Sequence, residues 1–159
     1  MKKVFSTILI LTLVSVLFAA RSNPGDISPA QQKTIKNEIL KVHDEMKKAG
    51  ESLNADELFK YVLDVNDVII ENGVLRATRK TALDITKDGF QGIKELTYTY
   101  NHKNINVISP TAALWTGTGA TNIVLEDGRK ITSDFAETIV FVQRDGRWKV
   151  LHAHRSSAN

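Results

Sequence analysis

The C-terminal half of the chain contains several long β-strand patterns in succession, and this feature limits the folds that the chain can adopt. Alternating apolar and polar residues, rich in β-branched and aromatic types, predict strands over residues 97–108, 112–125, 130–143 and 147–155. These segments are longer than the usual strand of about five or six residues. Because long neighbouring strands twist, we expect a strongly bent antiparallel sheet that wraps around the N-terminal part of the chain.

Turn signals separate the predicted strands. Between them lie Pro110, Asp127-Gly128 and Asp145-Gly146. Further upstream, Asn72-Gly73 joins the apolar runs 67–71 and 74–77, and Asn-Gly between two such runs is a strong hairpin signal. We therefore expect a short hairpin that precedes the long strands.

The segment before this hairpin has the pattern of an amphipathic helix. Ser28, followed by Pro29 and Gln31, predicts a helix start with a capping box. Gly50 is expected to end the helix. Apolar residues at spacings of three and four give one apolar stripe, formed by Ile35, Ile39, Val42 and Met46.

Two further helices complete the predicted elements. Asn54 followed by Glu57 is expected to start a second, shorter helix. Residues 79–96 have the pattern of a third helix or of two short turns, because Gly89 and Gly92 interrupt the helical spacing. This order of elements predicts an α+β fold in which three N-terminal helices pack on a strongly curved antiparallel sheet.

The first 22 residues follow the pattern of a secretory signal peptide. Lys2 and Lys3 precede an apolar run over residues 4–18, and small residues follow that run. The run is shorter than the roughly 20 residues of a bilayer-spanning helix, which disfavours an uncleaved anchor. We expect cleavage near Ser22, a single domain over residues 23–159, and a periplasmic or secreted protein that has no membrane segment after cleavage.

Removal of the signal peptide changes the charge balance. Three of the 21 basic residues lie in the first 22 positions, which hold no acidic residue, so that 18 basic and 18 acidic residues remain. A neutral chain lacks the basic surface that is typical of nucleic-acid binding, so no nucleic-acid partner is expected. The sequence has no cysteine, which excludes disulfides, a thiol nucleophile and thiolate metal sites. No phosphate-binding loop or metalloprotease motif is present, and no cofactor is expected.

The last strand carries the most specific family resemblance. Residues 144–156 contain an Asp-Gly turn, a Trp, an apolar pair and then His-x-His-x-Ser. Together with the order of elements, this ending resembles the nuclear transport factor 2-like superfamily in its SnoaL-like form. The closing strand is similar to that of the calcium/calmodulin-dependent protein kinase II association domain. The resemblance covers about residues 30–157 and implies a cone-shaped fold with a pocket, but it implies little about activity, because this fold hosts many functions.

The side chains that face this pocket depend on the loop of the last hairpin, because a slip of one residue turns each side chain to the other face. A two-residue loop would place Glu137 opposite His154, whereas a three-residue loop would place Glu137 and Arg155 on one face. The resemblance favours the three-residue loop, since the kinase association domain has a pocket-lining Arg at the position of Arg155. It has a second such Arg where this chain has Ile139, which implies weaker binding of an acidic ligand here.

Arg155 is the central residue of the candidate site. A charge near a sheet interior needs a partner, because an unpaired buried charge is costly. The partner is either Glu137, in a structural ion pair, or the carboxylate of a ligand. Amphipathic aromatic residues on elements that should border the pocket either line it or pack in the core or a dimer interface; they are Tyr61, Tyr98, Tyr100 and Trp115. The predicted ligand-binding residues are Tyr61, Trp115, Glu137, His154 and Arg155.

Other polar residues give weaker signals. His152 and His154 share a face of the last strand, but no third ligand at a suitable spacing accompanies them, so no metal site is expected. The resemblance places Asp67 and Glu71 where ketosteroid isomerase-like enzymes carry a catalytic carboxylate. Both are expected to be solvated, at the start of a strand and beside a turn, which disfavours a base with a raised pKa.

These observations predict an exported domain that binds a small molecule or a protein partner without catalysis. The ligand is expected to be small and hydrophobic or to bear a carboxylate. The alternative is a lyase, isomerase or cyclase that acts on a small hydrophobic substrate by general acid/base chemistry. Apolar residues occur on both faces of 112–125 and 130–143, and long exposed apolar surfaces are rare in monomers, so a homodimer through the sheet is expected.

Overall fold

The computed structural model describes residues 27–158. The predicted signal peptide and its cleavage near Ser22 lie outside the described residues. The helices in the described range are α1 Pro29–Glu51, α2 Ala55–Phe59 and α3 Arg79–Gly89. None of them is long and apolar enough to cross a membrane.

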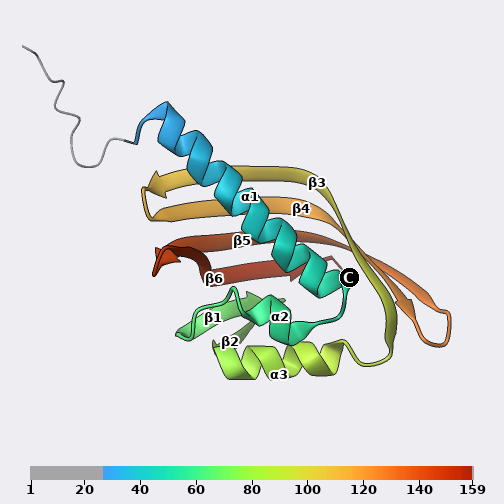
Figure 1. Ribbon diagram of the computed structural model, residues 1–159. Helices are drawn as coiled ribbons and strands as arrows, with labels where there is room; N and C mark the ends of the chain where they lie inside the picture. Colours follow the sequence, from blue (N-terminus) through green and yellow to red (C-terminus); the bar gives the residue numbers. More distant parts are fainter. Residues whose placement is uncertain (1–26, 159) are drawn as a thin grey trace, which may run out of the picture.

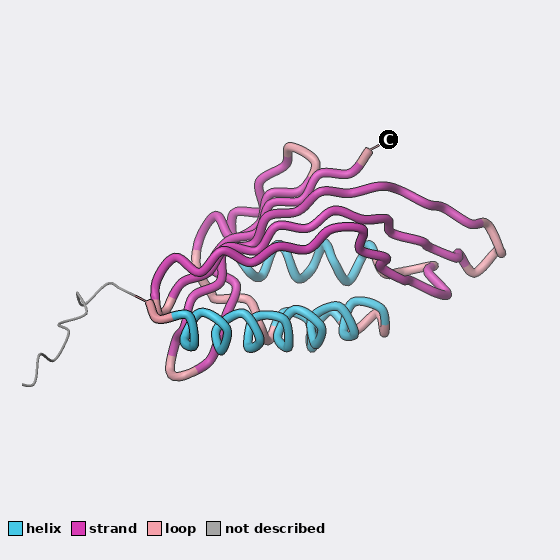
Figure 2. The backbone as a smooth tube through the Cα atoms, turned by 90° about the horizontal axis from the view of Figure 1, so that it is seen from above, coloured by secondary structure: helices cyan, strands magenta, loops and turns pink. Residues whose placement is uncertain are grey.

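The strands of the described range form one curved sheet. They are β1 Asn66–Glu71, β2 Val74–Thr78, β3 Ile93–Ser109, β4 Ala112–Leu125, β5 Lys130–Arg144 and β6 Arg147–Ser157. Their order across the sheet is β2-β1-β6-β5-β4-β3, with β1 parallel to β6 and the other neighbours antiparallel. Figure 1 shows the long α1 helix lying across the strands, and Figure 2 shows the helices on one side of the sheet. We call the helix-covered side the inner face and the opposite side the outer face. The predicted α+β fold is confirmed.

The helix starts agree with the capping signals. The Ser28 side chain accepts a hydrogen bond from the backbone of Gln31, and the Gln31 side chain accepts one from the backbone of Ser28, which completes the capping box. The side chain of Asn54 accepts from the backbone of Glu57 at the start of α2. Helix α1 continues one residue past Gly50, because the chain turns into the left-handed region only at Leu53, with φ at 56°.

The third helix is shorter than predicted. It ends at Gly89, and β3 already begins at Ile93 after a turn in which Gly92 has φ at 73°. Leu96, which fits the helical pattern, instead belongs to β3, where it is 4% exposed. The helical spacing of apolar residues therefore extends by coincidence into a strand, and the prediction of a helix through residue 96 is wrong.

The loop of the last hairpin differs from the expectation. Arg144 pairs with Arg147, so the loop consists of two residues, Asp145 and Gly146, with φ at 51° and 72°. Both values lie in the left-handed region that a tight two-residue hairpin turn requires. The three-residue loop that the resemblance favours is therefore wrong.

A β-bulge further along this hairpin restores the arrangement that the longer loop implied. The pairing of β5 with β6 shifts between Val140 and Phe141, so that one residue of β6 has no partner. As a result, Glu137 lies directly opposite Arg155, and the two residues share the inner face. His154 lies opposite Thr138 and faces the outer side.

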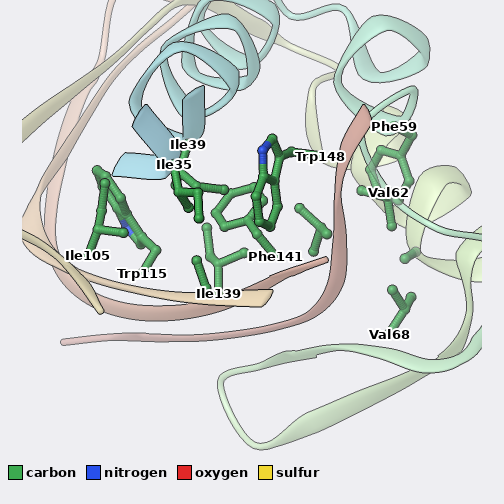
Figure 3. Close-up of a cluster of buried hydrophobic side chains, with 13 residues drawn as sticks. Ile35, Ile39, Phe59, Val62, Val68, Ile105, Trp115, Ile139, Phe141 and Trp148 are labelled. Atoms are coloured by element: carbon green, nitrogen blue, oxygen red, sulfur yellow. The ribbon is translucent and has the colours of Figure 1, made fainter. Parts of the chain in front are cut away.

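The hydrophobic core lies between α1 and the inner face of the sheet. Figure 3 shows Ile35 and Ile39 of α1 above Trp115 and Phe141 of the sheet. Both sheet residues are fully buried. Further members of this core are Phe59, Val62, Val68, Ile105, Ile139, Trp148 and Val150.

Candidate functional site

A carboxylate within this core, Glu137 on β5, is the centre of a polar cluster. Its Oε1 atom accepts hydrogen bonds from Nε1 of Trp115 at 3.0 Å and from the hydroxyl of Tyr100 at 2.8 Å. Nε2 of His43 lies 3.3 Å from the same oxygen. We call these four residues the Glu137 cluster. It joins α1 to β3, β4 and β5, and the Glu137 side chain is only 8% exposed.

His43 reaches this cluster because it lies on the buried stripe of α1. It follows Ile35 and Ile39 at spacings of four residues, and all three side chains are buried. Its ring stacks on that of Trp115, with a centroid distance of 3.7 Å and an interplanar angle of 20°. Nε2 lies 3.3 Å from the carboxylate oxygen of Glu137 and 3.1 Å from the hydroxyl of Tyr100. Nδ1 is buried without a hydrogen-bond partner in the described part of the chain.

Gly117 provides room for two rings of the Glu137 cluster because it has no Cβ atom. A Cβ atom at this position would lie 3.0 Å from Nε1 of Trp115 and 3.1 Å from a ring carbon of Tyr100. Both rings donate to Glu137, so a side chain at residue 117 would displace the donors. The absence of a side chain at residue 117 is therefore part of what allows the site to form.

The hydrogen bonds set the protonation of the cluster. Burial alone would raise the pKa of Glu137, but the hydrogen bonds with His43 and Tyr100 and the nearby charge of Arg155 lower it below its usual value. The pKa of Tyr100 is raised, first by burial and then by the charge of Glu137. Glu137 is therefore an ionised acceptor and Tyr100 a neutral donor at neutral pH.

Arg155 lies beside the cluster but contacts other groups. Its Nη2 atom donates to the hydroxyl of Thr121 at 2.5 Å. Its guanidinium carbon lies 3.9 Å from the ring centroid of Phe135 and 5.0 Å from that of Tyr98. Within residues 27–158 the guanidinium forms no ion pair with a carboxylate. Arg155 is thus a partly buried cation that rests on two aromatic rings.

Tyr98 borders the guanidinium at the C-terminal end of α1. Its ring packs against Gly50, where a Cβ atom would lie 3.2 Å from it. Burial raises the pKa of Tyr98, and the charge of Arg155 lowers it to a smaller extent. The hydroxyl therefore stays protonated and can donate a hydrogen bond beside Arg155.

The structure brings together three of the five predicted site residues. Trp115 and Glu137 belong to the Glu137 cluster, and Arg155 lies beside it. Tyr61 lies elsewhere, after α2, where its hydroxyl donates to Glu45. His154 is exposed on the outer face. The last two residues do not contribute to the arrangement around Arg155, and whether any of the five binds a ligand stays a prediction.

The sequence does not predict His43 as a site residue, and it predicts Tyr100 only as one of the aromatic residues that border the pocket. His43 fits the apolar stripe of α1 at the position four residues after Ile39, and this phase is the signal that could have located it on the buried side. Tyr100 lies on β3, where a bulge after it disturbs the alternation of inner and outer residues. Its contact with Glu137 depends on pairing across two strands, which the pattern of one strand does not reveal.

Two hollows open on the surface, and Arg155 is in the lining of neither. One, of about 310 Å³, includes Glu137 and Gly117 of the site in its lining, together with His102, Thr116, Thr118, Ala136, Thr138, His154 and Ser156. The other, of about 540 Å³, lies between the turn after α1 and the end of α3, with Leu53, Asp56, Lys87 and Phe90 in its lining. Among the described residues, no group of three His, Asp or Glu side chains is placed to hold a metal ion. The ring of His152 contacts the carbonyl oxygen of Asp67.

Solved structures with similar folds include enzymes and a kinase assembly domain. A proposed calcium/calmodulin-dependent protein kinase II association domain from Xanthomonas campestris is 17% identical, with a TM-score of 0.69 over 84% of this chain and 94% of that chain. A proposed scytalone dehydratase from Novosphingobium aromaticivorans is 11% identical, with a TM-score of 0.73 over 83% and 89%. A type 2 hexachlorocyclohexane dehydrochlorinase (LinA) is 15% identical, with a TM-score of 0.70 over 83% and 90%. At these identities the likeness establishes the fold alone.

The comparison with protein families is more specific than these structural similarities. No curated protein sequence matches the chain. The sequence profile of the SnoaL-like domain, in contrast, matches residues 39–159, which is most of the chain. The helices and the curved sheet have the arrangement of nuclear transport factor 2-like proteins. The chain therefore belongs to the SnoaL-like family.

Proposed function

We propose that the inner face of this domain binds a small molecule that bears a carboxylate, and that Arg155 recognises this group. The observation that carries the proposal is that Glu137 and Arg155 contact different groups rather than each other. Glu137 receives its hydrogen bonds from the Glu137 cluster, and this leaves Arg155 without a carboxylate in the described part of the chain. A ligand carboxylate would supply the missing negative charge.

The surroundings of Arg155 suit such a ligand. A guanidinium presents several N–H donors in one plane, and this geometry matches the two oxygens of a carboxylate. One donor is directed to Thr121, which fixes the orientation of the group. The rings of Phe135 and Tyr98 lie against the guanidinium and offer an apolar surface for the hydrophobic part of the ligand.

Isothermal titration calorimetry with 3-phenylpropanoate and 4-methylbenzoate as probes tests this proposal. Arg155→Met keeps the apolar stem and removes the charge, and it should weaken binding more than tenfold. Arg144→Met, at an exposed position next to the hairpin loop, is the matched control and should bind like the wild type. Equal affinity in the wild type and Arg155→Met would overturn the assignment, as would the failure of both acids and of their amino derivatives to bind.

A second candidate function, general acid/base catalysis by a lyase, isomerase or cyclase, is favoured by Nδ1 of His43. Glu137 contacts the ring at Nε2, and Nδ1, which has no partner among the described residues, can serve as a base when it is unprotonated. NMR can follow deuterium exchange at carbon next to a carbonyl group in a panel of small ketones. Exchange that disappears in His43→Gln, while the fold is retained, would support catalysis. The same slow exchange with and without protein would count against it.

We also propose that the protein is exported and forms a homodimer through the outer face. The outer side chains Leu114, Val140 and Val142 are partly exposed, while Ile139 and Phe141 are buried on the inner side. Strand β4 carries no charged residue over its whole length, so a self-complementary contact there would bring no like charges together. The N-terminal signal pattern supports export.

A further inference from the structure

Three charged residues form a row across neighbouring strands of the sheet. Arg155 on β6 lies opposite Glu137 on β5 and opposite Glu71 on β1. Because paired residues of adjacent strands project from the same face, the row lies on the inner face. A single cation therefore has a carboxylate on either side of it.

Arg155 pairs with neither neighbour. It extends across β5 toward Thr121 on β4 and covers the ring of Phe135. Glu137 is occupied within its own cluster. Glu71 makes no ion pair and no side-chain hydrogen bond with any other residue from 27 to 158. The guanidinium and the Glu71 carboxylate thus make no ion pair with each other and leave two unmatched opposite charges on one surface.

The register of the sheet places the two charges on neighbouring strands, with Glu71 of β1 paired with Arg155 of β6. The Tyr98 ring lies 5.0 Å from the guanidinium carbon. Burial is the main cause of the raised pKa of Tyr98, the charge of Arg155 lowers it, and the charges of Glu137 and Glu71 raise it further, which agrees with this placement. Arg155 therefore lies beside Tyr98, and Glu71 is the neighbour of Arg155 across the sheet.

This arrangement disfavours a ligand that carries only a negative charge. A plain carboxylate at Arg155 would also meet the fields of Glu137 and Glu71, and like charges in a partly buried site repel more strongly than in water. A positive group on the ligand, placed toward Glu71, would remove this repulsion and add an attraction. The aromatic surface of Phe135 and Tyr98 would still hold the apolar part.

We propose that the ligand is a zwitterion of the amino-acid type, with its carboxylate at Arg155 and its ammonium group at Glu71. This inference rests on the proposed carboxylate binding at Arg155 and narrows it to one class of molecule. Adjacent strands are about 4.8 Å apart, and the guanidinium lies over β5, so the two charged groups of the protein are roughly two strand spacings apart. A ligand whose charges are separated by several bonds fits this distance.

Two matched sets of probes test the inference by calorimetry. The first set is 4-(aminomethyl)benzoate, 4-methylbenzoate and 4-methylbenzylamine, and the second is phenylalanine, 3-phenylpropanoate and 2-phenylethylamine. We expect 4-(aminomethyl)benzoate, whose charges lie at opposite ends of the ring, to bind about fivefold or more tightly than its matched acid. Phenylalanine carries both charges on one carbon and should show a smaller preference, and the amines should bind most weakly. This preference should weaken as the salt concentration rises.

The Glu71→Gln variant tests the zwitterion inference separately from the proposed carboxylate binding at Arg155. The variant should bind the matched acids at least as well as the wild type does but lose the preference for the zwitterion. Glu95→Gln, an exposed position on β3, is the control and should keep the preference. Melting curves establish that both variants fold. If the wild type bound the matched acids as tightly as the zwitterions, or more tightly, the zwitterion inference would be overturned, whereas the proposed carboxylate binding would stand. A preference that persists in Glu71→Gln would also overturn it, and failure of every probe would remove both proposals.

Discussion

Glu137 and Arg155 lie directly opposite each other on β5 and β6, yet their charged groups are held by different partners. The carboxylate accepts from Trp115 and Tyr100, while the guanidinium donates to Thr121. If these facing residues formed a salt bridge with each other, both side chains would serve mainly to stabilise the fold. The observed division makes Glu137 a link between α1 and the sheet, and it leaves Arg155 available for another group.

Removal of the two charges should therefore have unequal effects on stability. Arg155→Met breaks no ion pair, and we expect the free energy of unfolding to change by less than about 1 kcal/mol. Glu137→Ala leaves the buried donors of Trp115 and Tyr100 without an acceptor and should cost about 3–5 kcal/mol. Urea denaturation of both variants measures the difference. A loss in Arg155→Met as large as in Glu137→Ala would show that the two side chains act as a structural pair.

The free energy of unfolding should depend on pH through the protonation of Glu137. Its pKa in the folded protein lies below the ordinary value of 4.5, so on acidification the unfolded state takes up the proton first. The stabilisation is complete above about pH 4.5 and is lost as the pH falls through the lowered folded value. Urea denaturation between pH 7 and pH 3 should show this loss in the wild type and a smaller one in Glu137→Gln. Equal slopes in the two proteins would contradict the role of Glu137.

Two glycines of β4 predict graded effects of adding a methyl group. At Gly119 a Cβ atom would lie 2.1 Å from the backbone oxygen of Thr99, whereas at Gly117 the nearest atoms, at 3.0–3.1 Å, belong to side chains. Gly119→Ala should therefore destabilise by more than about 3 kcal/mol, and Gly117→Ala by about 1–3 kcal/mol. Gly89→Ala is the control, because nothing lies within 4 Å of its Cβ position. Thermal melts that rank Gly117→Ala below Gly119→Ala in stability would contradict the packing described.

The architecture could be predicted from the sequence because each element carries a local signal. The capping residues around Ser28, the Asn72-Gly73 turn and the long alternating runs depend on neighbouring residues alone, and the structure reproduces them. The bulge in β6 does not have such a signal. It decides which of Arg155 and His154 faces the core, and it arises from packing between strands rather than from the sequence of one strand.

The candidate site could be predicted only in part for the same reason. Glu137 and Arg155 were placed on one face through the family resemblance, although the loop that was thought to cause this is not the one observed. His43 lies on α1, 94 residues before Glu137 in the sequence. Their contact forms only because α1 packs on the sheet. Local patterns cannot specify such a contact.

Export makes a prediction that mass spectrometry can check. Lys2, Lys3 and the apolar run that follows should direct secretion, with removal of the segment that ends near Ser22. The intact mass of protein recovered from the exported fraction should correspond to a chain that starts at Asn23. A replacement of Leu11 and Leu13 by Lys should retain the protein in the cytoplasm. Exported wild-type protein that still begins at Met1 would contradict cleavage.

The proposed homodimer predicts that one outer-face substitution disrupts assembly without unfolding the domain. Val140 and Leu114 are paired neighbours on β5 and β4, and both face outward at partly exposed positions. If the outer face forms the dimer contact, Val140→Asp places a charge beside the uncharged strand β4 and near its own symmetry mate, so analytical ultracentrifugation at micromolar concentration should change from a dimer to a monomer. Ile131→Asp is the control, since Ile131 is 45% exposed at the far end of β5 and should leave the dimer intact. A monomeric wild type at the same concentration, or equal dissociation of both variants, would show that the outer face is not the contact.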